Sequence, residues 1–180
     1  MAQLLDAVTM ARDPAAQGVL VVMAGRAWAG AELRKVHGQR LDAFDAGDAG
    51  PLAVNEAGQL HWWRAVPSRD ALGLQRIQRD AADWPRVEIV LNHVGAGGAL
   101  VDALVGQGVH GIVAAGTGNG TLHRDLEAVL LRAQAQGVRV LHASRCAAGL
   151  VLGNDPLPSA GRLTAVQARI ELLLELLGSV

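Results

Sequence analysis

Three short apolar runs, separated by two amphipathic segments, constrain the fold of this 180-residue chain most strongly. The runs are "VEIVLNHV" (87–94), "HGIVAAG" (110–116) and "GVRVLHAS" (137–144), which are rich in Val, Ile and Leu and barely alternate. Such runs are typical of strands that are covered on both faces, as in a parallel sheet flanked by helices. A fourth run, "GVLVVMAG" (18–25), shows the same pattern and receives the same interpretation.

The two segments that separate the runs at 87–94, 110–116 and 137–144 have helical spacing. Each places four apolar residues on one face, with the charges of the second segment on the opposite side. These residues are Leu100, Val101, Leu104 and Val105 in the first segment, and Leu122, Leu126, Val129 and Leu130 in the second. Glycines at positions 108 and 137 are expected to stop the two helices in a left-handed conformation. Residues 87–144 therefore predict a right-handed β-α-β-α-β unit.

Two further helices are expected near the ends of the chain, at 4–12 and at 164–178, the latter with Thr164 as N-cap and Gly178 as its stop. The intervening region is less regular. "AGDAGPL" predicts a turn, "QLHWWRAV" (59–66) a strand or an extended arm, and Trp84-Pro85 the start of the compact second half.

The loop Gly116-Thr117-Gly118-Asn119-Gly120 follows a predicted parallel strand and precedes a predicted helix. Ligands bind at this end of open α/β sheets, because free backbone N–H groups and the helix dipole favour anions there. The loop lacks the third glycine and the later acidic residue of the dinucleotide fingerprint, and no P-loop lysine follows it. The alternative interpretation is a tight turn in which Thr121 caps the helix.

The other reactive residues give weak signals. The six histidines never pair at metal-ligand spacing; His110 and His142 fall within strand runs and are expected at the edge of the core. His93 ends a strand run before a glycine-rich loop, a better place for chemistry, although an ordinary structural role is favoured. Cys146 would need a neighbouring base to act as a nucleophile. Three aspartates in a Gly/Ala-rich stretch are interpreted as solvated loop charges and not as a calcium site: Asp42, Asp45 and Asp48. No metal or cofactor is predicted.

Charge and hydropathy narrow the partners. The net charge is −1 without a basic run, so no nucleic-acid partner is expected. No apolar stretch approaches about 18 residues, so no membrane partner is expected either. The first residues lack a cationic start followed by an apolar block, which predicts a cytoplasmic location.

The order of these segments resembles bacterial type II L-asparaginases over residues 2–177. "GVLVVMAG" is similar to their "GVLVVMND" strand, and "HGIVAAGTGNG" to "KGIVIAGTGNG". "GVRVLHASRC" is similar to "GVVVVRSSR", and "GRLTAVQARIELLLELL" to "GDLNPQKARILLMLAL". The resemblance implies an α/β protein: a parallel sheet flanked by helices, as in the asparaginase small domain, preceded by the last elements of a truncated large α/β domain. The implied boundaries are 1–45 for the large-domain remnant, 46–84 for a connecting arm and 85–180 for the carboxyl-terminal domain.

The activity that the resemblance implies is hydrolysis of L-asparagine to L-aspartate and ammonia. The family's nucleophilic threonine lies in "TGGTIA", a second threonine and an aspartate in "HGTDTMEET", and a lysine in "RP…SADGP"; none of these segments occurs in the 180 residues. We therefore expect them to lie ahead of Met1, leaving the chain without catalytic residues and inactive by itself. The resemblance also implies a periplasmic location for a full-length relative that carries a leader.

The resemblance also implies where substrate would be held. In the family the small domain of one subunit completes the site of its neighbour, so a homo-oligomer or a partner half is expected. The substrate-holding position after the glycine loop falls on Thr121, and the family's glutamate is assigned to Asp155 in a shorter loop. The loop 116–120 and His93 are expected near this site.

Three hypotheses follow. The first is the asparaginase-family amidohydrolase, inactive until another chain completes its site. The second is a non-catalytic assembly or complementation partner of a separate amino-terminal half, because a truncated domain exposes apolar surface and sheet edge. The third is a diverged short enzyme with a new site around His93, Thr117 and Thr121, which requires a shared cleft.

Overall fold

The computed structural model describes residues 2–68, 70–153 and 156–178. The chain divides into two compact units, Met1–Asp70 and Ala71–Val180, which are described separately. No helix within the described residues is long and apolar enough to cross a membrane.

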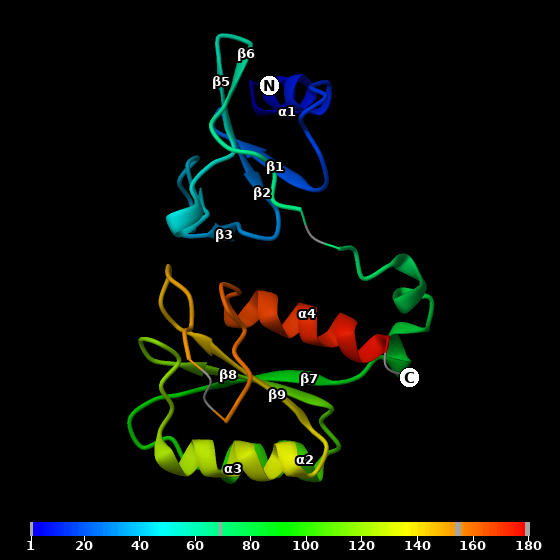
Figure 1. The fold of residues 1–180 in the computed structure, drawn as a ribbon, viewed down its shortest axis with the longest axis vertical. Coiled ribbons are helices and arrows are strands. Elements are labelled where there is room, and N and C mark those ends of the chain that lie inside the picture. Colours follow the sequence, from blue (N-terminus) through cyan, green and yellow to red (C-terminus); the bar gives the residue numbers. More distant parts are fainter. Residues whose placement is uncertain (1, 69, 154–155, 179–180) are drawn as a thin grey trace. The chain divides into compact units, whose positions relative to one another are not determined.

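The first unit consists of one helix, a four-stranded antiparallel sheet and a small two-stranded sheet (Figure 1). The helix, α1, packs against the first strand and agrees with the predicted helix at 4–12. The larger sheet has the order β1-β2-β5-β6. The elements are α1 (Ala2–Ala11), β1 (Leu20–Met23), β2 (Arg26–Ala29), β5 (Ala53–Glu56) and β6 (Gln59–Trp62). The small sheet contains β3 (Arg34–Lys35) and β4 (Phe44–Asp45), followed by the 3-10 helix η1 (Gly47–Ala49).

The interpretation of run 18–25 as a parallel strand was wrong. β1 pairs antiparallel with β2 through a two-residue turn, with Met23 opposite Arg26. Both faces of β1 are nevertheless covered, one by α1 and the other by the layer that holds Trp28 and Phe44. A strand that is partly covered on both faces therefore lacks alternation whether its neighbour runs parallel or antiparallel, and the apolar run alone could not distinguish the two.

Both hairpins of the larger sheet turn on an Ala-Gly pair. Ala24 and Ala57 have φ angles of 50° and 51°, and each is followed by a glycine that also has a positive φ. Two residues with positive φ form the turn whose twist matches a hairpin, a position where Asn or Asp is usual and alanine is strained. The turns were therefore difficult to recognise in the sequence.

The second unit is a three-layered α/β structure built on a parallel sheet of order β7-β8-β9, which confirms the predicted β-α-β-α-β unit (Figure 1). All six residues of the central strand are buried. Helices α2 and α3 cover one face and α4 covers the other. The elements are β7 (Val87–Leu91), α2 (Ala99–Gly106), β8 (Gly111–Gly116), α3 (Arg124–Ala135), β9 (Arg139–Ser144) and α4 (Ala165–Leu177), with the 3-10 helices η2 (Leu74–Ile77) and η3 (Ala81–Asp83) ahead of β7.

The helix signals in the sequence were largely correct. Gly108 and Gly137 have φ angles of 75° and 93° just past α2 and α3, as predicted. Thr164 forms a capping box with Gln167 at the start of α4. Gly178 stands at the end of α4 without a left-handed conformation; instead Arg76 Nη1 donates to the carbonyls of two residues in the last turn, at 3.1 and 3.2 Å.

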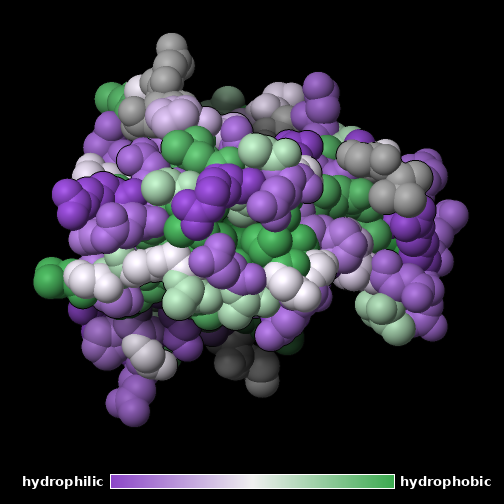
Figure 2. Space-filling model, turned by 90° about the horizontal axis from the view of Figure 1, so that it is seen from below, coloured by the Kyte–Doolittle hydropathy of each residue, from purple (hydrophilic) through white to green (hydrophobic). Residues whose placement is uncertain are grey.

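The outer face of α3 is mostly polar, with Arg124, Asp125, Arg132 and Gln134 exposed. Figure 2 shows hydrophilic residues over much of the face seen from below, with hydrophobic residues visible between them. One apolar assignment was wrong, because Leu100 is 56% exposed whereas its neighbour Val101 is fully buried. The buried stripe of α2 is therefore narrower than the sequence suggested.

Residues 46–84, predicted as a connecting arm, contain η1, β5, β6, η2 and η3. The strands β5 and β6 belong to the larger sheet of the first unit, η1 precedes them in the same unit, and η2 and η3 precede β7 in the second unit.

Candidate functional site

The three parallel strands end at the same edge of the sheet, and the predicted glycine loop leaves from the middle one. Asn92 follows β7, Thr117 follows β8 and Arg145 follows β9. Because the strands are parallel and in register, these residues lie at one carboxyl edge, where ligands bind in open α/β sheets.

The loop after β8 is a closed turn. Thr117 and Thr121 form an isolated antiparallel bridge, in which the Thr117 N–H donates to the Thr121 carbonyl at 3.0 Å and the Thr121 N–H donates to the Thr117 carbonyl at 2.8 Å. A Cβ added to Gly116 would lie 2.3 Å from the Gly120 carbonyl oxygen, closer than any side chain allows. The turn therefore requires glycine where it approaches its own backbone.

Asn92 attaches this turn to β7. Its side chain is buried, donates from Nδ2 to the Thr121 carbonyl at 3.3 Å and accepts from the His123 N–H at 2.8 Å. The backbone N–H of Asn92 donates to the Ala115 carbonyl at 3.0 Å. One amide side chain thus fixes both the end of the turn and the entrance to α3.

Residues after β9 hold the turn from the other side. The Arg145 N–H donates to the Gly116 carbonyl and its Nη1 to the Asn92 carbonyl, both at 2.8 Å. The Ser144 hydroxyl donates to the Gly118 carbonyl at 2.5 Å and accepts from the Cys146 N–H at 2.9 Å. The ends of all three strands are therefore joined by hydrogen bonds that pass through or beside the turn.

A third attachment comes from the segment that precedes α4. The Asn119 side chain donates to the Leu152 carbonyl at 2.6 Å and accepts from the Leu152 N–H at 2.7 Å. His142 lies beneath Gly120, fully within the core, and no described residue pairs with its Nε2. His142 was expected at the edge of the core with ordinary hydrogen bonds, so this burial is a correction. His110, by contrast, is exposed ahead of β8, where its Nδ1 accepts from the Arg86 N–H at 3.0 Å.

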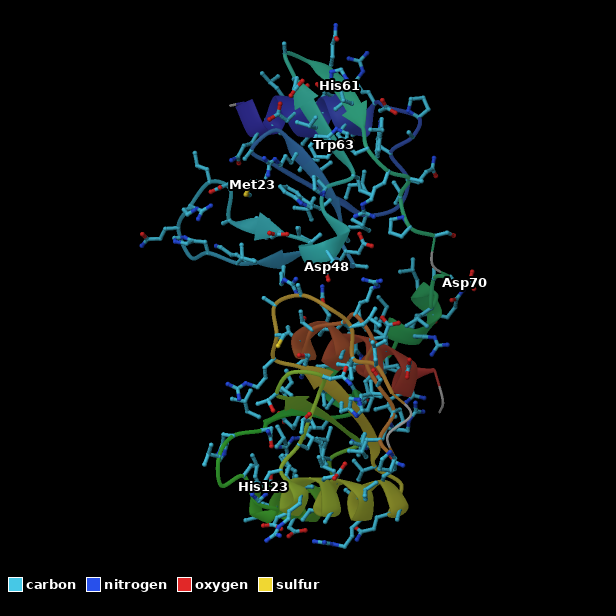
Figure 3. The ribbon with its side chains drawn as sticks, turned by 60° about the vertical axis from the view of Figure 1, so that its left-hand side comes forward. Met23, Asp48, His61, Trp63, Asp70 and His123 are labelled. Atoms are coloured by element: carbon cyan, nitrogen blue, oxygen red, sulfur yellow. The ribbon has the colours of Figure 1, made fainter. Side chains whose placement is uncertain are left out.

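The start of α3 differs from the predicted cap. His123, and not Thr121, is the N-cap residue, and its Nδ1 accepts from the Asp125 N–H at 3.2 Å (Figure 3). Thr121, which lies two residues before His123, instead forms the bridge to Thr117. The first turn of α3 also carries Asp125 and Glu127, whose charges oppose a phosphate at this helix end. The turn is thus poorly suited to hold a phosphate.

The Thr121 side chain is exposed at the sheet edge, and within the described part of the chain no residue bonds its hydroxyl. The Thr117 hydroxyl, in contrast, donates to the Thr121 carbonyl at 3.3 Å. Thr121 therefore presents a hydroxyl on a backbone fixed from several sides. Asp155, the other predicted substrate contact, lies outside the described residues.

His93 lines one of the cavities of the second unit. Its Nδ1 lies 2.8 Å from the neighbouring Val94 carbonyl, and the ring lines an open cavity of about 320 Å³ beside α2. The cavity is also lined by Leu91, Gly97 and Leu100, but by neither Thr117 nor Thr121. This cavity therefore does not provide the shared cleft that a new enzymatic site around these three residues requires.

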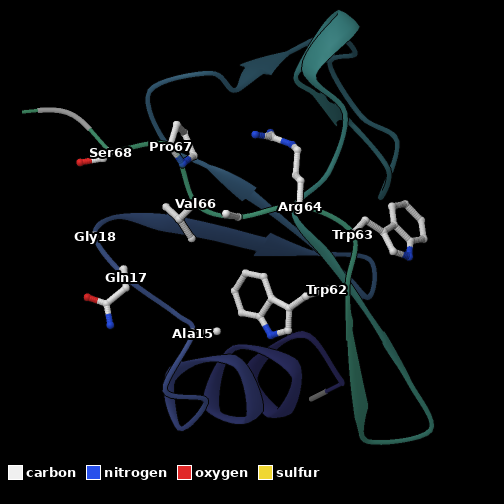
Figure 4. Close-up of a pocket in the computed structure, with 10 residues that line it drawn as sticks. Ala15, Gln17, Gly18, Trp62, Trp63, Arg64, Val66, Pro67 and Ser68 are labelled. Carbon is white, nitrogen blue, oxygen red and sulfur yellow. The ribbon is translucent and has the colours of Figure 1, made fainter.

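A larger cavity, of about 780 Å³, lies in the first unit between the segment after α1 and the segment after β6 (Figure 4). Trp62 faces it from one side of the strand, and the neighbouring Trp63 points to the other side. Arg64 at its rim donates to Glu32 at 2.5 Å and to the Gly50 carbonyl at 2.9 Å, so its charge is already paired. The described residues that line this cavity all belong to the first unit.

The aspartates of the first unit do not form a metal site. Arg40 holds Asp42 through bonds of 2.8 and 2.6 Å, and these hydrogen bonds, with the nearby charge, lower the pKa of the Asp42 carboxyl to about 2. In the described ranges no three His, Cys, Asp or Glu side chains gather where they could hold a metal ion.

Two residues at the sheet edge carried no recognisable signal. Asn92 and Arg145 hold the turn in place, yet each is a single polar residue after an apolar run. The only available hint was position, since a polar residue directly after a buried strand often faces the ligand edge.

Comparison with known proteins connects both units to one family. Residues 86–178 match the family model described as the Glutaminase/Asparaginase C-terminal domain, and residues 1–67 match the one described as Asparaginase, N-terminal. The chain is 30% identical to L-asparaginase 2 of Escherichia coli (strain K12) over 96% of its own length and 52% of that protein. It is 33% identical to a glutamyl-tRNA(Gln) amidotransferase subunit from Pyrococcus furiosus over 82% of its length and 35% of that protein.

A solved structure shares the fold. The crystal structure of a probable cytoplasmic L-asparaginase from Campylobacter jejuni superposes with a TM-score of 0.86 at 27% identity, covering 97% of this chain and 58% of that one. The chain spans about half the length of the curated relatives it matches.

Proposed function

Because the chain belongs to the glutaminase/asparaginase family, we propose that its carboxyl sheet edge forms one wall of a site that hydrolyses L-asparagine to L-aspartate and ammonia. The remaining walls, with the nucleophile and its activating groups, come from family segments beyond these 180 residues. They belong to the same polypeptide, to a neighbouring subunit or to a partner chain.

The exposed Thr121 hydroxyl is the observation that carries this proposal. It projects from a turn that Asn92 and Arg145 attach to the neighbouring strands. A hydroxyl can accept one hydrogen bond from a substrate ammonium and donate one to a carboxylate. Thr121 thus holds the amino-acid end of the substrate, and Asp155 is its proposed companion as the acidic partner of the ammonium.

The chemistry at this edge is incomplete in the chain by itself. The Ser144 hydroxyl donates to a backbone carbonyl, and no carboxylate or imidazole among the described residues contacts the oxygen or sulfur of Ser144, Thr117 or Cys146. Attack on an amide requires a nucleophile with an adjacent base and donors for the oxyanion. We therefore expect a chain of these 180 residues to bind substrate weakly and not to turn it over.

Ammonia release provides the first test. The purified chain is incubated with L-asparagine, with and without a second chain that carries the family's "TGGTIA" segment. We expect no ammonia above the buffer background from the chain by itself, and release from the mixture. Turnover by the unassisted chain at a rate comparable with its full-length relatives would refute the proposal.

Variants at Thr121 test its role in the completed mixture. Loss of one hydrogen bond to the charged substrate predicts that Thr121→Val lowers kcat/KM by about 10-fold or more, a loss of about 1.5–3 kcal/mol. Thr121→Ser keeps the hydroxyl and is expected to retain most of the activity. Equal activity of the two variants would show that the hydroxyl does not hold substrate.

A non-catalytic assembly or complementation partner is the second candidate, favoured by the exposed apolar side chains of Leu4, Leu5 and Val8 on α1. If the chain is an assembly partner only, the mixture forms a complex, and Thr121→Val does not change the rate at which the mixture releases ammonia. Both candidates include location in the cytoplasm, without nucleic-acid or membrane partners. The net charge of −1 argues against a nucleic-acid partner. The Campylobacter relative, described as a probable cytoplasmic L-asparaginase, supports the location.

A further inference from the structure

The turn after β8 contains an asparagine followed directly by a glycine. Asn119 is the only one of the four asparagines in the sequence that precedes glycine; the others precede glutamate, histidine or aspartate. Glycine has no Cβ to shield its backbone nitrogen, so this pair favours attack of that nitrogen on the asparagine carboxamide. Asn119 is exposed, and none of the described residues accepts a hydrogen bond from the Gly120 N–H. The turn therefore holds a reactive carboxamide and a nitrogen that is not tied to an acceptor.

Two hydrogen bonds to Leu152 oppose this attack. The Asn119 Nδ2 donates to the Leu152 carbonyl at 2.6 Å, and the Asn119 Oδ1 accepts from the Leu152 N–H at 2.7 Å. Both bonds direct the carboxamide toward a residue 33 positions away in the chain. The attack requires the carboxamide to turn back toward the next residue, Gly120. The reaction therefore requires that the Asn119 side chain first separates from Leu152.

The backbone that restrains Asn119 is held in turn by Ser159. The Ser159 hydroxyl donates to the Val151 carbonyl at 3.1 Å and accepts from the Gly161 N–H at 2.9 Å. The Val151 N–H also donates to the Gly161 carbonyl at 3.1 Å. Leu152 itself is 63% exposed, so its side chain contributes little packing to the attachment. The hydroxyl of Ser159 therefore fixes the backbone next to the two bonds that restrain the carboxamide.

We propose that Asn119 is a site of spontaneous deamidation, which the bonds to Leu152 hold in check and which proceeds when the segment before α4 opens. The Gly120 nitrogen loses its proton to a base in solution and bonds to Cγ of Asn119, and the Nδ2 group leaves as ammonia. Water then opens the resulting cyclic imide at either carbonyl–nitrogen bond. Opening at Cγ gives aspartate, and opening at the backbone carbonyl gives isoaspartate. In sum, water is consumed and ammonia is released.

Either product changes the turn that carries Thr121. A carboxylate at position 119 has no proton to donate to the Leu152 carbonyl, so the 2.6 Å bond is lost and two oxygens face each other instead. Isoaspartate also adds a methylene group to the backbone between Thr117 and Thr121, whose two mutual bonds close the turn. Deamidation therefore loosens the turn at the carboxyl edge of the sheet and places a negative charge there. This inference does not depend on the proposed function.

Ageing of the purified chain in mildly alkaline buffer tests the proposal. Peptide mass spectrometry measures the conversion at position 119, and enzymatic methylation detects isoaspartate separately. The same chain unfolded in urea gives the rate without the restraint. Because opening breaks two hydrogen bonds, we expect Asn119 in the folded chain to react more slowly than in urea by about 10-fold or more. Asn55 and Asn92, which precede larger residues, should react more slowly than Asn119 in urea.

A variant that loosens the restraint without altering the reacting residues provides the second test. Ser159→Ala removes the bond to the Val151 carbonyl and should speed the conversion of Asn119 in the folded chain by about 3-fold or more. The matched control, Ser68→Ala, changes an exposed serine of the first unit and should leave the rate unaltered. Equal rates in the folded and unfolded chain, no conversion at position 119 in urea, or an unaltered rate in a folded Ser159→Ala variant would each overturn the proposal.

Discussion

Replacing Asn92 with alanine should release the glycine turn from the sheet. The substitution removes the 2.8 Å bond to the His123 N–H and the weaker 3.3 Å bond to the Thr121 carbonyl. A half-buried donor left without a partner costs about 1–3 kcal/mol, and the longer bond adds a smaller amount. We expect a local destabilisation of about 2 kcal/mol, which corresponds to roughly 30-fold faster opening at the turn.

Amide hydrogen exchange, followed by NMR, measures this change where it occurs. The amides of Thr121 and His123 should exchange roughly 30-fold faster in Asn92→Ala than in the unaltered chain. The matched control is Asn55→Ala, which removes a single side-chain bond to Asp6 in the other unit and should leave the exchange of both amides unchanged. Unaltered protection in Asn92→Ala, within a factor of about two, would falsify the view that this side chain fixes the turn.

Three further predictions concern local geometry. Ala24→Asn should raise the free energy of unfolding by about 0.5–1 kcal/mol in urea titrations, because asparagine tolerates the φ of 50° better than alanine; lower stability would contradict this. Gly116→Ala should strongly disrupt the turn, and NMR should show lost protection of the amides in the turn. The control is Gly97→Ala, which has nothing within 4 Å of its added Cβ and should change the free energy of unfolding by less than about 0.5 kcal/mol. Similar outcomes for the two variants would refute the backbone clash. Because Arg40 lowers the pKa of Asp42 to about 2, the stabilisation from this pair is present above the ordinary aspartate pKa and is lost as the pH falls toward 2. Arg40→Gln should raise the pKa of Asp42 toward its ordinary value, as measured by NMR titration. An unchanged pKa would count against the pairing.

The second unit was predictable because its signals are local. Apolar runs of five or six residues, helical spacing and the stops at Gly108 and Gly137 each report on the backbone of the same segment. These signals agree with one another, so the β-α-β-α-β unit and its helix positions followed. The capping box at Thr164 was recognisable for the same reason.

The first unit was harder because its turns carry the wrong residues. Alanine at a positive φ gives no turn signal, so the hairpins at Ala24 and Ala57 were hidden, and β1 was assigned to a parallel sheet. Tertiary contacts decide which neighbouring strand β1 pairs with, and a four-residue run does not encode those contacts.

The candidate site was predicted in outline and not in detail. The glycine loop, at the carboxyl end of β8, was found from its pattern. Its attachments were not, because the bonds from Asn92 and Arg145 join residues 29 and 53 positions apart in the chain. The cap at His123 was missed because Thr121, the better capping residue by type, is already committed to the bridge with Thr117.

The attachment of one short turn to its surroundings at Asn92, Arg145 and Leu152 has a thermodynamic consequence for ligand capture. Because these bonds already order the turn before a ligand binds, binding costs little conformational entropy on this side of the site. Under the proposed function, the affinity for substrate would then depend mainly on the order of the other walls of the site, and mutations that raise the affinity should be sought in those walls.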